Sequence, residues 1–448
     1  MQEVKIIGAG LAGSEASLQL SKRGIKVKLY EMRPNKTTGA HVTEDCAEFV
    51  CSNSLGSADI SNASGLLKKE MELLECELLK IAYENAVPAG NALAIAREDF
   101  SQAVTEKIKN DPYIELIREE ITEIPEGNVI IASGPLTSDK FADAIQRFTK
   151  NEHLHFFDAI APIVEIDSIN FDKAFWASRY DKGEASYINC PMNKEEYENF
   201  YNILINAPRI EQHQVDKTSK YFESCLPVEV LASRGTDTLR FGPMKPVGLI
   251  DKHTGIESYA VVQLRQDNSA KTLFNLVGFQ TNLKWGAQKE LVHSIPGLEN
   301  ANIVRYGVMH RKTFINSSQV LNPTLETKER ENLFFAGQIT GTEGYTESIA
   351  TGMLAGINMA RKLCNQEMLS LPRETMLGAI TFYITDKAHL EHISSRDNSL
   401  RYLPPQPINS NWGILPSIEL PKGERKNKKL KNELLAKRAV ETLEKVLN

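Results

Sequence analysis

The sequence predicts an α/β protein in which a Rossmann-like dinucleotide-binding domain is interrupted by an inserted α+β domain and followed by a helical C-terminal tail. Three observations predict this class. Gly8, Gly10 and Gly13 follow an apolar strand pattern near the N-terminus. A second glycine-spaced segment follows the apolar run at 333–336. Strand-rich patterns punctuated by Pro and Gly fill much of the region between them.

The N-terminal motif predicts a dinucleotide site. Gly8 permits the tight strand-to-helix turn, Gly10 leaves space for a pyrophosphate, and Gly13 lets helix and strand pack closely. The helix N-terminus adds unpaired N–H groups and a positive dipole end. Glu31, eighteen residues after Gly13, stands where an acid accepts a hydrogen bond from a ribose hydroxyl. The residues expected at this end of the site are Gly8, Ala9, Gly10, Leu11, Ala12, Gly13 and Glu31. This motif alone leaves NAD and FAD open.

The rest of the first domain shows alternating helix and strand patterns. The elements expected here are one amphipathic helix from Leu66 to Leu79, a helix over 97–110 with Asp99 or Ser101 near its start, and strands over 114–117 and 129–131. The last strand runs into Gly134, and small residues at the carboxyl end of a strand let a cofactor or a crossing chain segment approach the backbone.

A second strand-to-helix turn distinguishes the two cofactors. The run at 333–336 meets Gly337 and Gln338, then a glycine-spaced loop and a helix of small residues that includes Tyr345. Two such turns at opposite ends of one chain are typical of large FAD domains of the glutathione-reductase type, and NAD-only dehydrogenases rarely need the second. We therefore favour FAD, held also by Gly134, Gly337, Gln338 and Tyr345. The alternative is a closely packed helix hairpin.

These patterns divide the chain into four stretches. We expect residues 1–150 to form the first part of the FAD-binding domain, 151–300 an inserted substrate domain, 301–365 the second part of the FAD-binding domain, and 366–448 a helical, basic C-terminal region. The basic run at 422–438 is interpreted as a solvated helix face, with a nucleic-acid contact as the alternative.

Composition excludes several classes. With 25% charged and 42% hydrophobic residues, the 448-residue chain has the composition of a folded globular protein. It has no apolar run of the ~18–20 residues that span a bilayer, and its first strand leaves no space for a signal peptide, so we expect a cytoplasmic protein without membrane contact. The net charge of −6 argues against wholesale capture of nucleic acid but allows local basic patches. The spacing of cysteines and histidines predicts no metal site.

Two cysteines are candidates for chemistry. Cys51 lies in a small polar stretch after the ribose acid, and Cys225 lies in a loop near Arg234 and Arg240. A cysteine becomes a strong nucleophile when a nearby cation lowers its pKa. The alternative, favoured by context alone, is that both are small buried hydrophobic residues. We interpret the remaining cysteines in that way: Cys46, Cys76, Cys190 and Cys364.

Several cations lie beside aromatic residues. A histidine such as His310 is more often a structural group, yet its ring, next to Arg311, has the chemistry to stack on a flat ligand whose carboxylates pair with the guanidinium. Arg265 and the pair Lys284–Trp285 have the chemistry to stack on unpaired bases. They are equally compatible with ordinary surface residues whose apolar stems pack on the protein.

Residues 1–363 resemble the bacterial folate- and FAD-dependent tRNA (uracil-5-)-methyltransferase family, TrmFO, a relative of the larger GidA (MnmG) proteins. The segments that carry the resemblance are long and collinear: GAGLAGSEA, FVCSNSL, VPAGNALA, APIVE, SRYDKGEA, NCPM, CLPVEV, FGPMKPVGL, YAVVQLRQD, VGFQTNLKWG, IPGLENANIVRYGVMHR and FFAGQITGTEGY. The chain lacks the greater length of GidA. The wider FAD-oxidoreductase pattern often has Asp where this chain has Gln338.

The resemblance implies an enzyme that transfers the methylene of 5,10-methylenetetrahydrofolate to C5 of uridine 54 in the tRNA T-loop. Reduced FAD would supply electrons, and NADH or NADPH would recharge it. The family's nucleophile falls on Cys225, its flavin-side cysteine and expected base on Cys51, and its folate-stacking histidine on His310, beside Arg311.

The required chemistry agrees with this assignment. Uracil C5 becomes nucleophilic only when C6 carries an electron-donating adduct, and a transferred methylene is one hydride short of a methyl group. A thiolate and a flavin meet these two needs. The alternatives are the same reaction on a 23S rRNA uridine and a flavin oxidoreductase of small molecules. NADH or NADPH preference and oligomeric state stay open.

Overall fold

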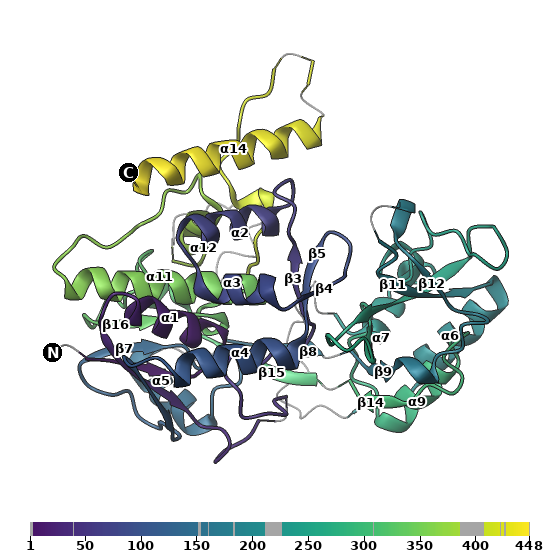
Figure 1. Ribbon diagram of the computed structural model, residues 1–448, viewed down its shortest axis with the longest axis horizontal. Helices are drawn as coiled ribbons and strands as arrows, with labels where there is room; N and C mark the ends of the chain where they lie inside the picture. Colours follow the sequence, from purple (N-terminus) through teal and green to yellow (C-terminus); the bar gives the residue numbers. More distant parts are fainter. Residues whose placement is uncertain are drawn as a thin grey trace.

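The structure is a computed structural model that describes residues 3–38, 40–150, 154–159, 161–181, 184–210, 226–307, 309–385, 407–421, 423–424 and 427–447, with the backbone alone for 154–159 and 309–312. The described chain forms two units (Figure 1). The larger one contains both ends of the chain and a parallel sheet, and the smaller one is built from the middle of the chain.

The larger unit is centred on a five-stranded parallel sheet in the order β16-β7-β1-β2-β6. Its strands are β1 (Glu3–Ile7), β2 (Lys26–Glu31), β6 (Ile114–Arg118), β7 (Asn128–Ile131) and β16 (Leu333–Phe335). The strands predicted from apolar runs are therefore confirmed, and the second glycine segment returns the chain to the same sheet beside β7.

Helix α1 (Leu11–Ser21) packs closely on α11 (Tyr345–Leu363). Glycines make this approach possible, since a Cβ on Gly352 would lie 2.2 Å from the carbonyl oxygen of Ala12. A Cβ on Gly13 would lie 1.8 Å from the carbonyl oxygen of Gly8. Gly13 therefore has the packing role expected from the motif.

The single helix predicted from Leu66 to Leu79 is wrong. The chain forms α2 (Ala63–Leu73) and α3 (Glu77–Glu84), separated by a break in which Glu75 has φ +57°. Glu15 of α1 explains the break, because its carboxylate accepts the N–H groups of Glu77 at 3.1 Å and Leu78 at 2.7 Å. This carboxylate caps the start of a new helix from a distant part of the chain.

The remaining elements of the first part are α4 (Arg97–Lys109), α5 (Asp139–Thr149), and a three-stranded antiparallel sheet of β3 (Ser54–Ser57), β5 (Ala92–Ile95) and β4 (Ala86–Val87). Ala96 is the N-cap of α4, and Asp99 lies in its first turn. The predicted helix over 97–110 is therefore confirmed to within one residue.

The smaller unit contains a six-stranded antiparallel sheet in the order β10-β11-β12-β13-β9-β14. Its elements are β9 (Ile163–Glu165), η1 (Ile166–Ser168), β10 (Phe175–Ala177), η2 (Arg179–Asp181), β11 (Tyr187–Met192), α6 (Lys194–Asn206), α7 (Val228–Ala232), α8 (Thr238–Phe241), β12 (Ala260–Gln266), β13 (Leu273–Leu276), α9 (Trp285–His293) and β14 (Ile303–Arg305). The expected strand-rich character of this region is confirmed.

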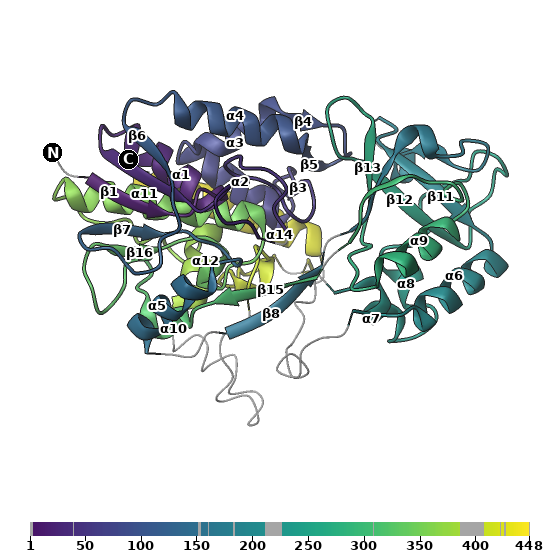
Figure 2. The same ribbon diagram turned by 90° about the horizontal axis from the view of Figure 1, so that it is seen from below.

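An antiparallel ribbon of β8 (Leu154–Ala159) and β15 (Met309–Phe314) lies where the chain passes between the two units (Figure 2). The backbone of His310 pairs with that of Asp158. After β15 the chain forms α10 (Ser317–Val320) and returns through β16 to η5 (Gln338–Thr340) and α11.

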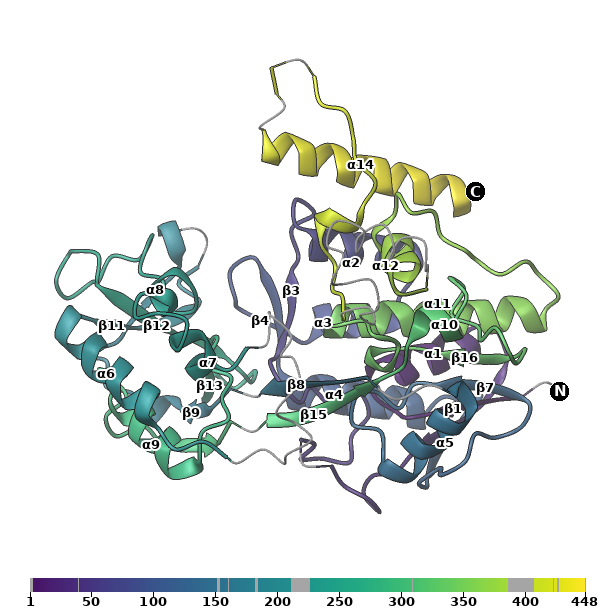
Figure 3. The ribbon, with the colours of Figure 1, turned by 180° about the vertical axis from the view of Figure 1, so that it is seen from behind.

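The C-terminal region is helical at α12 (Met376–Thr385) and α14 (Lys428–Leu447), and α14 lies against α2 (Figure 3). The expected helical C-terminal region is interrupted at residues 407–421, which have little regular secondary structure apart from one short turn, η6 (Trp412–Ile414). The backbone of Ile408 pairs with Thr342, just before α11. Among the described residues, no helix is long and apolar enough to cross a membrane.

Candidate functional site

The turn between β1 and α1 forms one end of a cavity. Gly8 has φ +101°, a conformation that favours glycine. Gly10 is the N-cap of α1 and makes no side-chain cap, so the first turn of the helix offers backbone N–H groups. A Cβ on Gly10 would meet nothing within 4 Å. This open space beside a positive helix end fits the pyrophosphate of a dinucleotide.

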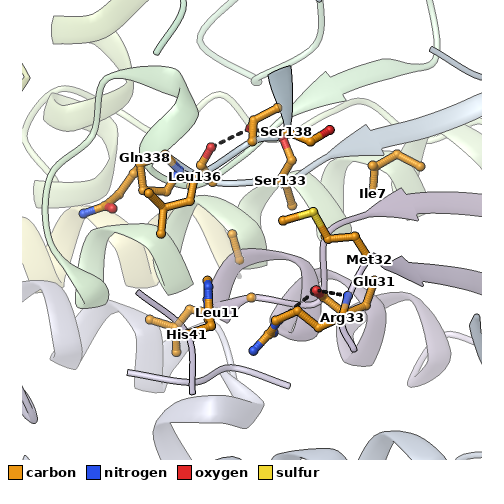
Figure 4. Close-up of a pocket in the computed structure, with 18 of the residues that line it drawn as sticks. Ile7, Leu11, Glu31, Met32, Arg33, His41, Ser133, Leu136, Ser138 and Gln338 are labelled. Atoms are coloured by element: carbon orange, nitrogen blue, oxygen red, sulfur yellow. Dashed lines mark hydrogen bonds and ion pairs between the residues drawn. The ribbon is translucent and has the colours of Figure 1, made fainter. Parts of the chain in front are cut away.

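Glu31 lies at the end of β2 and is buried. One carboxylate oxygen accepts a hydrogen bond from the N–H of Ala9 at 3.0 Å. The other accepts a hydrogen bond from Nε of Arg33 at 2.9 Å (Figure 4). Burial alone would raise the pKa of Glu31, but the charge and hydrogen bonds of Arg33 outweigh it and hold the pKa below its usual value. A charged carboxylate suits a hydrogen bond from a ribose hydroxyl.

The cavity continues from this turn to the second glycine segment. Its lining includes most of the predicted cofactor residues: Gly8, Gly10, Leu11, Ala12, Glu31, Gly134, Gly337, Gln338 and Tyr345. Ala9 and Gly13 are not part of the lining. Ala9 is fully buried, and Gly13 packs against Gly8. The two ends of the predicted site, more than 300 residues apart in sequence, thus border one cavity.

Ser133, one of the small residues expected beside the cofactor after β7, also lines the cavity. Sequence reasoning missed several other polar lining residues: Arg33, His41, Glu48, Thr137 and Ser138. Figure 4 shows Arg33, His41, Ser133 and Ser138 around the cavity. Ser133 and Thr137 share a hydrogen bond of 2.7 Å just beyond β7. Arg33 and Ser133 each follow the carboxyl end of a parallel strand, β2 and β7, and this position is the signal that points to them.

Cys51 is fixed by its backbone and is half-buried. Its N–H donates to the Tyr345 hydroxyl at 2.6 Å, and its carbonyl accepts Nη2 of Arg97 at 2.8 Å. Cys51 borders a second cavity of about 130 Å³, whose other lining residues come mostly from the smaller unit, among them Arg265, Asn275 and Gln280. This cysteine therefore lies at the junction of the two units.

A buried polar network holds the Cys51 segment in place. Asn53 donates to the carbonyls of Ile95 at 3.0 Å and Gln266 at 2.7 Å, and it accepts Nε of Arg265 at 2.9 Å. Arg97 pairs with Asp267 at 2.8 Å. Arg265 is 8% exposed and lines the Cys51 cavity, so it is not the ordinary surface residue that the sequence also allowed.

The other predicted chemical residues are only partly described. Cys225 lies outside the described residues, as do the side chains of His310 and Arg311. The chain after Cys225 is anchored by the Val228 N–H, which donates at 2.7 Å to the carbonyl of Gln280, a residue of the Cys51 cavity.

The remaining cysteines differ among themselves. Burial raises the pKa of Cys46 to about 11 and also raises the pKa of Cys76 and Cys190, in agreement with their interpretation as inert hydrophobic residues. Cys364 is exposed, so the same interpretation is wrong for it. In the part of the chain that the structure describes, no group of three or more His, Cys, Asp or Glu residues is placed to hold a metal ion.

The paired glycine turns, Glu31 and the cavity between them define a dinucleotide-binding α/β protein of the FAD type. The family model of glucose inhibited division protein A (GIDA) matches residues 3–367. TrmFO proteins from Bacillus velezensis and Anoxybacillus flavithermus are 53% and 54% identical, with 99% of this chain covered in each case and 98% and 99% of theirs. The chain therefore belongs to the GidA family and, within it, to the TrmFO group.

Solved structures agree on the fold. Aquifex aeolicus GidA in its form II crystal superimposes with a TM-score of 0.65 at 18% identity, covering 86% of this chain and 67% of that one. The form I crystal gives a TM-score of 0.63 at 17% identity, covering 90% and 76%.

Proposed function

We propose that this protein is a methylenetetrahydrofolate–tRNA-(uracil-5-)-methyltransferase that converts uridine 54 of the tRNA T-loop to 5-methyluridine. The observation that carries the proposal is the near-complete match to proteins named for this activity, with a further TrmFO, from Bacillus subtilis, 53% identical over 445 residues. The position of Cys51 beside a cavity between the two units supports it. We place the reaction in the cytoplasm, where tRNA and folates occur.

The cavity between the glycine turns would hold FAD. The N-terminus of α1 would face the pyrophosphate, Glu31 the ribose, and the Gly337–Gln338 turn the flavin end. Bound FAD, after reduction by NADH or NADPH, supplies the hydride that turns a transferred methylene into a methyl group. No metal ion enters this scheme.

The chain's own residues would activate the uracil. In the proposed sequence the Cys225 thiolate adds to C6, and C5 then forms a bond to the methylene carbon as the bond from that carbon to N10 of the folate breaks. Cys51 accepts the C5 proton as the remaining bond from the methylene carbon to N5 breaks, which releases tetrahydrofolate. When the methylene carbon receives the hydride, the C5–C6 double bond re-forms and the thiolate leaves C6. His310 would stack on the pterin and Arg311 would pair with the folate carboxylates.

The Cys51 cavity is the proposed place for the uracil. Asn275 and Gln280 bring amide groups to a site that Cys51 also borders. Amides and a guanidinium suit the alternating carbonyl and N–H edge of uracil. A base reaches such a cavity only after it leaves the stack of the folded loop.

Isotope labelling tests the proposal. The holoenzyme is given T-arm RNA, NADH or NADPH, and methylenetetrahydrofolate labelled in its one-carbon unit. Label is expected in 5-methyluridine at position 54. A parallel reaction with labelled S-adenosylmethionine should transfer none, and transfer there would overturn the proposal. A 23S rRNA fragment distinguishes the rRNA alternative, and RNA-independent turnover of small molecules without label in RNA would favour the oxidoreductase.

A further inference from the structure

Exposed Trp285 stacks on half-buried Tyr306 on the smaller unit. Their ring centroids lie 5.6 Å apart with an interplanar angle of 17°. Trp285 is 62% exposed, whereas Tyr197 and Phe200 of the same unit lie in its core. A large flat surface facing water at the start of α9 is therefore a feature that core packing does not explain.

A buried amide holds the two rings together. Gln288 of α9 donates from Nε2 to the carbonyls of Gly307 and Leu283, each at 2.8 Å. Its Oε1 accepts the Gly307 N–H at 2.7 Å. Gln288 is 1% exposed, so these bonds are shielded from water. The segment that carries Tyr306 is thereby fixed to the first turn of α9, and the platform is formed before any ligand arrives.

Each of the two chain segments that carry the rings connects the pair to the region of the Cys51 cavity. Trp285 follows Gln280, which lines that cavity, by five residues, a span of at most ~18 Å. Tyr306 follows Arg305, whose Nη2 donates to the carbonyls of Ala40 at 2.9 Å and Val50 at 3.2 Å. Val50 directly precedes Cys51. A nucleotide chain entering the cavity would have its neighbouring bases near the platform.

Cations accompany the rings. Lys284, Lys289 and Arg209 are exposed. The Lys284 N–H donates to the carbonyl of Pro208 at 3.0 Å, and Arg209 forms an antiparallel backbone bridge with Leu283. The segment that carries Arg209 therefore lies beside the segment that carries Lys284. Glu290 is an exposed acid of the same helix. Aromatic rings with cations at their edge are the usual means of binding unpaired nucleotides.

We infer that Trp285 and Tyr306 form a stacking platform for an unpaired base of the RNA substrate that neighbours the target uridine. The inference rests on the proposed function, because it assigns a second contact for the same RNA. A ring that stacks on a base selects for an unpaired loop rather than for sequence, since every base has a flat face.

The test uses the FAD-bound enzyme with a T-arm hairpin RNA. Trp285→Ala should raise the Kd and the KM for RNA about 10-fold, with kcat at saturating RNA changed by less than about 2-fold. Tyr113→Ala removes another exposed aromatic ring, 41% exposed and beside β6, and should leave both constants unchanged.

Fluorescence gives a second readout. The chain has three tryptophans, and RNA should quench the wild-type emission. Trp285→Phe keeps an aromatic ring, so it should bind RNA with a Kd close to that of the wild type while losing most of the quenching. Equal quenching in Trp285→Phe, or an unchanged Kd and KM in Trp285→Ala, overturns the inference. If the wild type neither binds nor methylates the hairpin, the proposed function itself fails.

Discussion

Nε of Arg265 donates to Oδ1 of Asn53 at 2.9 Å, although 212 residues separate them. Arg265 belongs to the antiparallel sheet of the smaller unit, and Asn53 follows Cys51 by two residues in the larger one. Both side chains are buried. This hydrogen bond therefore links the position of the Cys51 segment to the docking of the inserted unit.

Asn53→Ala should destabilise the protein and slow methylation. The substitution leaves the Arg265 Nε–H and the carbonyls of Ile95 and Gln266 without their buried partner. We expect a loss of about 2–4 kcal/mol in the free energy of unfolding, measured by denaturant titration, and a lower kcat. Asn91→Ala, at an exposed position of the same region, is the matched control. Equal stability of the two variants would contradict the proposed role of Asn53.

Gly10 and Gly13 should respond differently to substitution. Gly10→Ala places a Cβ in open space, so the fold should persist while the pyrophosphate loses its place and FAD is lost. Gly13→Ala forces a Cβ against the Gly8 carbonyl, so it should lower the Tm of the protein without its cofactor. Flavin absorbance and thermal melts of the apoprotein separate the two effects. A Gly10→Ala protein that keeps its FAD would argue against the assigned pyrophosphate position.

The two cysteines should divide the chemistry. Cys225→Ala should neither methylate RNA nor form a stable adduct with RNA that carries 5-fluorouridine, because the bond to C6 is assigned to its thiolate. Cys51→Ala should fail to methylate yet still form the covalent complex, because a missing base blocks a later step. A denaturing gel reads both results. Adduct with Cys225→Ala alone would reverse the roles, and adduct with both variants would place the nucleophile elsewhere.

Glu70 should make stability depend on pH. Its carboxylate caps α12 by accepting the N–H groups of Met376 at 2.6 Å and Leu377 at 2.8 Å, and burial raises its pKa to about 7 from 4.5. Between these two values the native state holds a proton that the unfolded state has lost, so stability falls as pH rises through this range.

As the pH rises from 4.5 to 7, Glu70 should lower the free energy of unfolding by up to about 3 kcal/mol, and it should cause no further change above pH 7. Glu70→Gln is uncharged, so the fall in Tm between pH 5 and pH 8 should be smaller than in the wild type. Glu72→Gln, on the same helix at an exposed position, should keep the wild-type profile. Identical profiles for the wild type and Glu70→Gln would rule out this role.

The sequence alone determined the features that local chemistry controls. Gly8 and Gly13 predicted the first turn because only glycine allows the close approaches found there, whereas Gly10 keeps open the space expected for the pyrophosphate. Apolar residues predicted β1, β2, β6, β7 and β16 of the parallel sheet, since most of the side chains that these strands bury are hydrophobic. Glu31 followed from its spacing after the glycines. Resemblance to a family, rather than spacing, pointed to the roles of Cys51, Cys225 and His310.

Only the tertiary structure decided the features that depend on distant partners. The break at Glu75 arises because Glu15 caps a second helix from α1, and a helical repeat in the sequence contains no sign of that contact. Arg265 reads as a surface cation, yet Asn53 holds it in the interior, because a buried guanidinium is stable once its donors are paired. The stacking of Trp285 on Tyr306 also joins two distant segments. The hydrophobic periodicity of a sequence indicates which residues share one face of a helix or strand, whereas tertiary packing decides which of these faces contact each other.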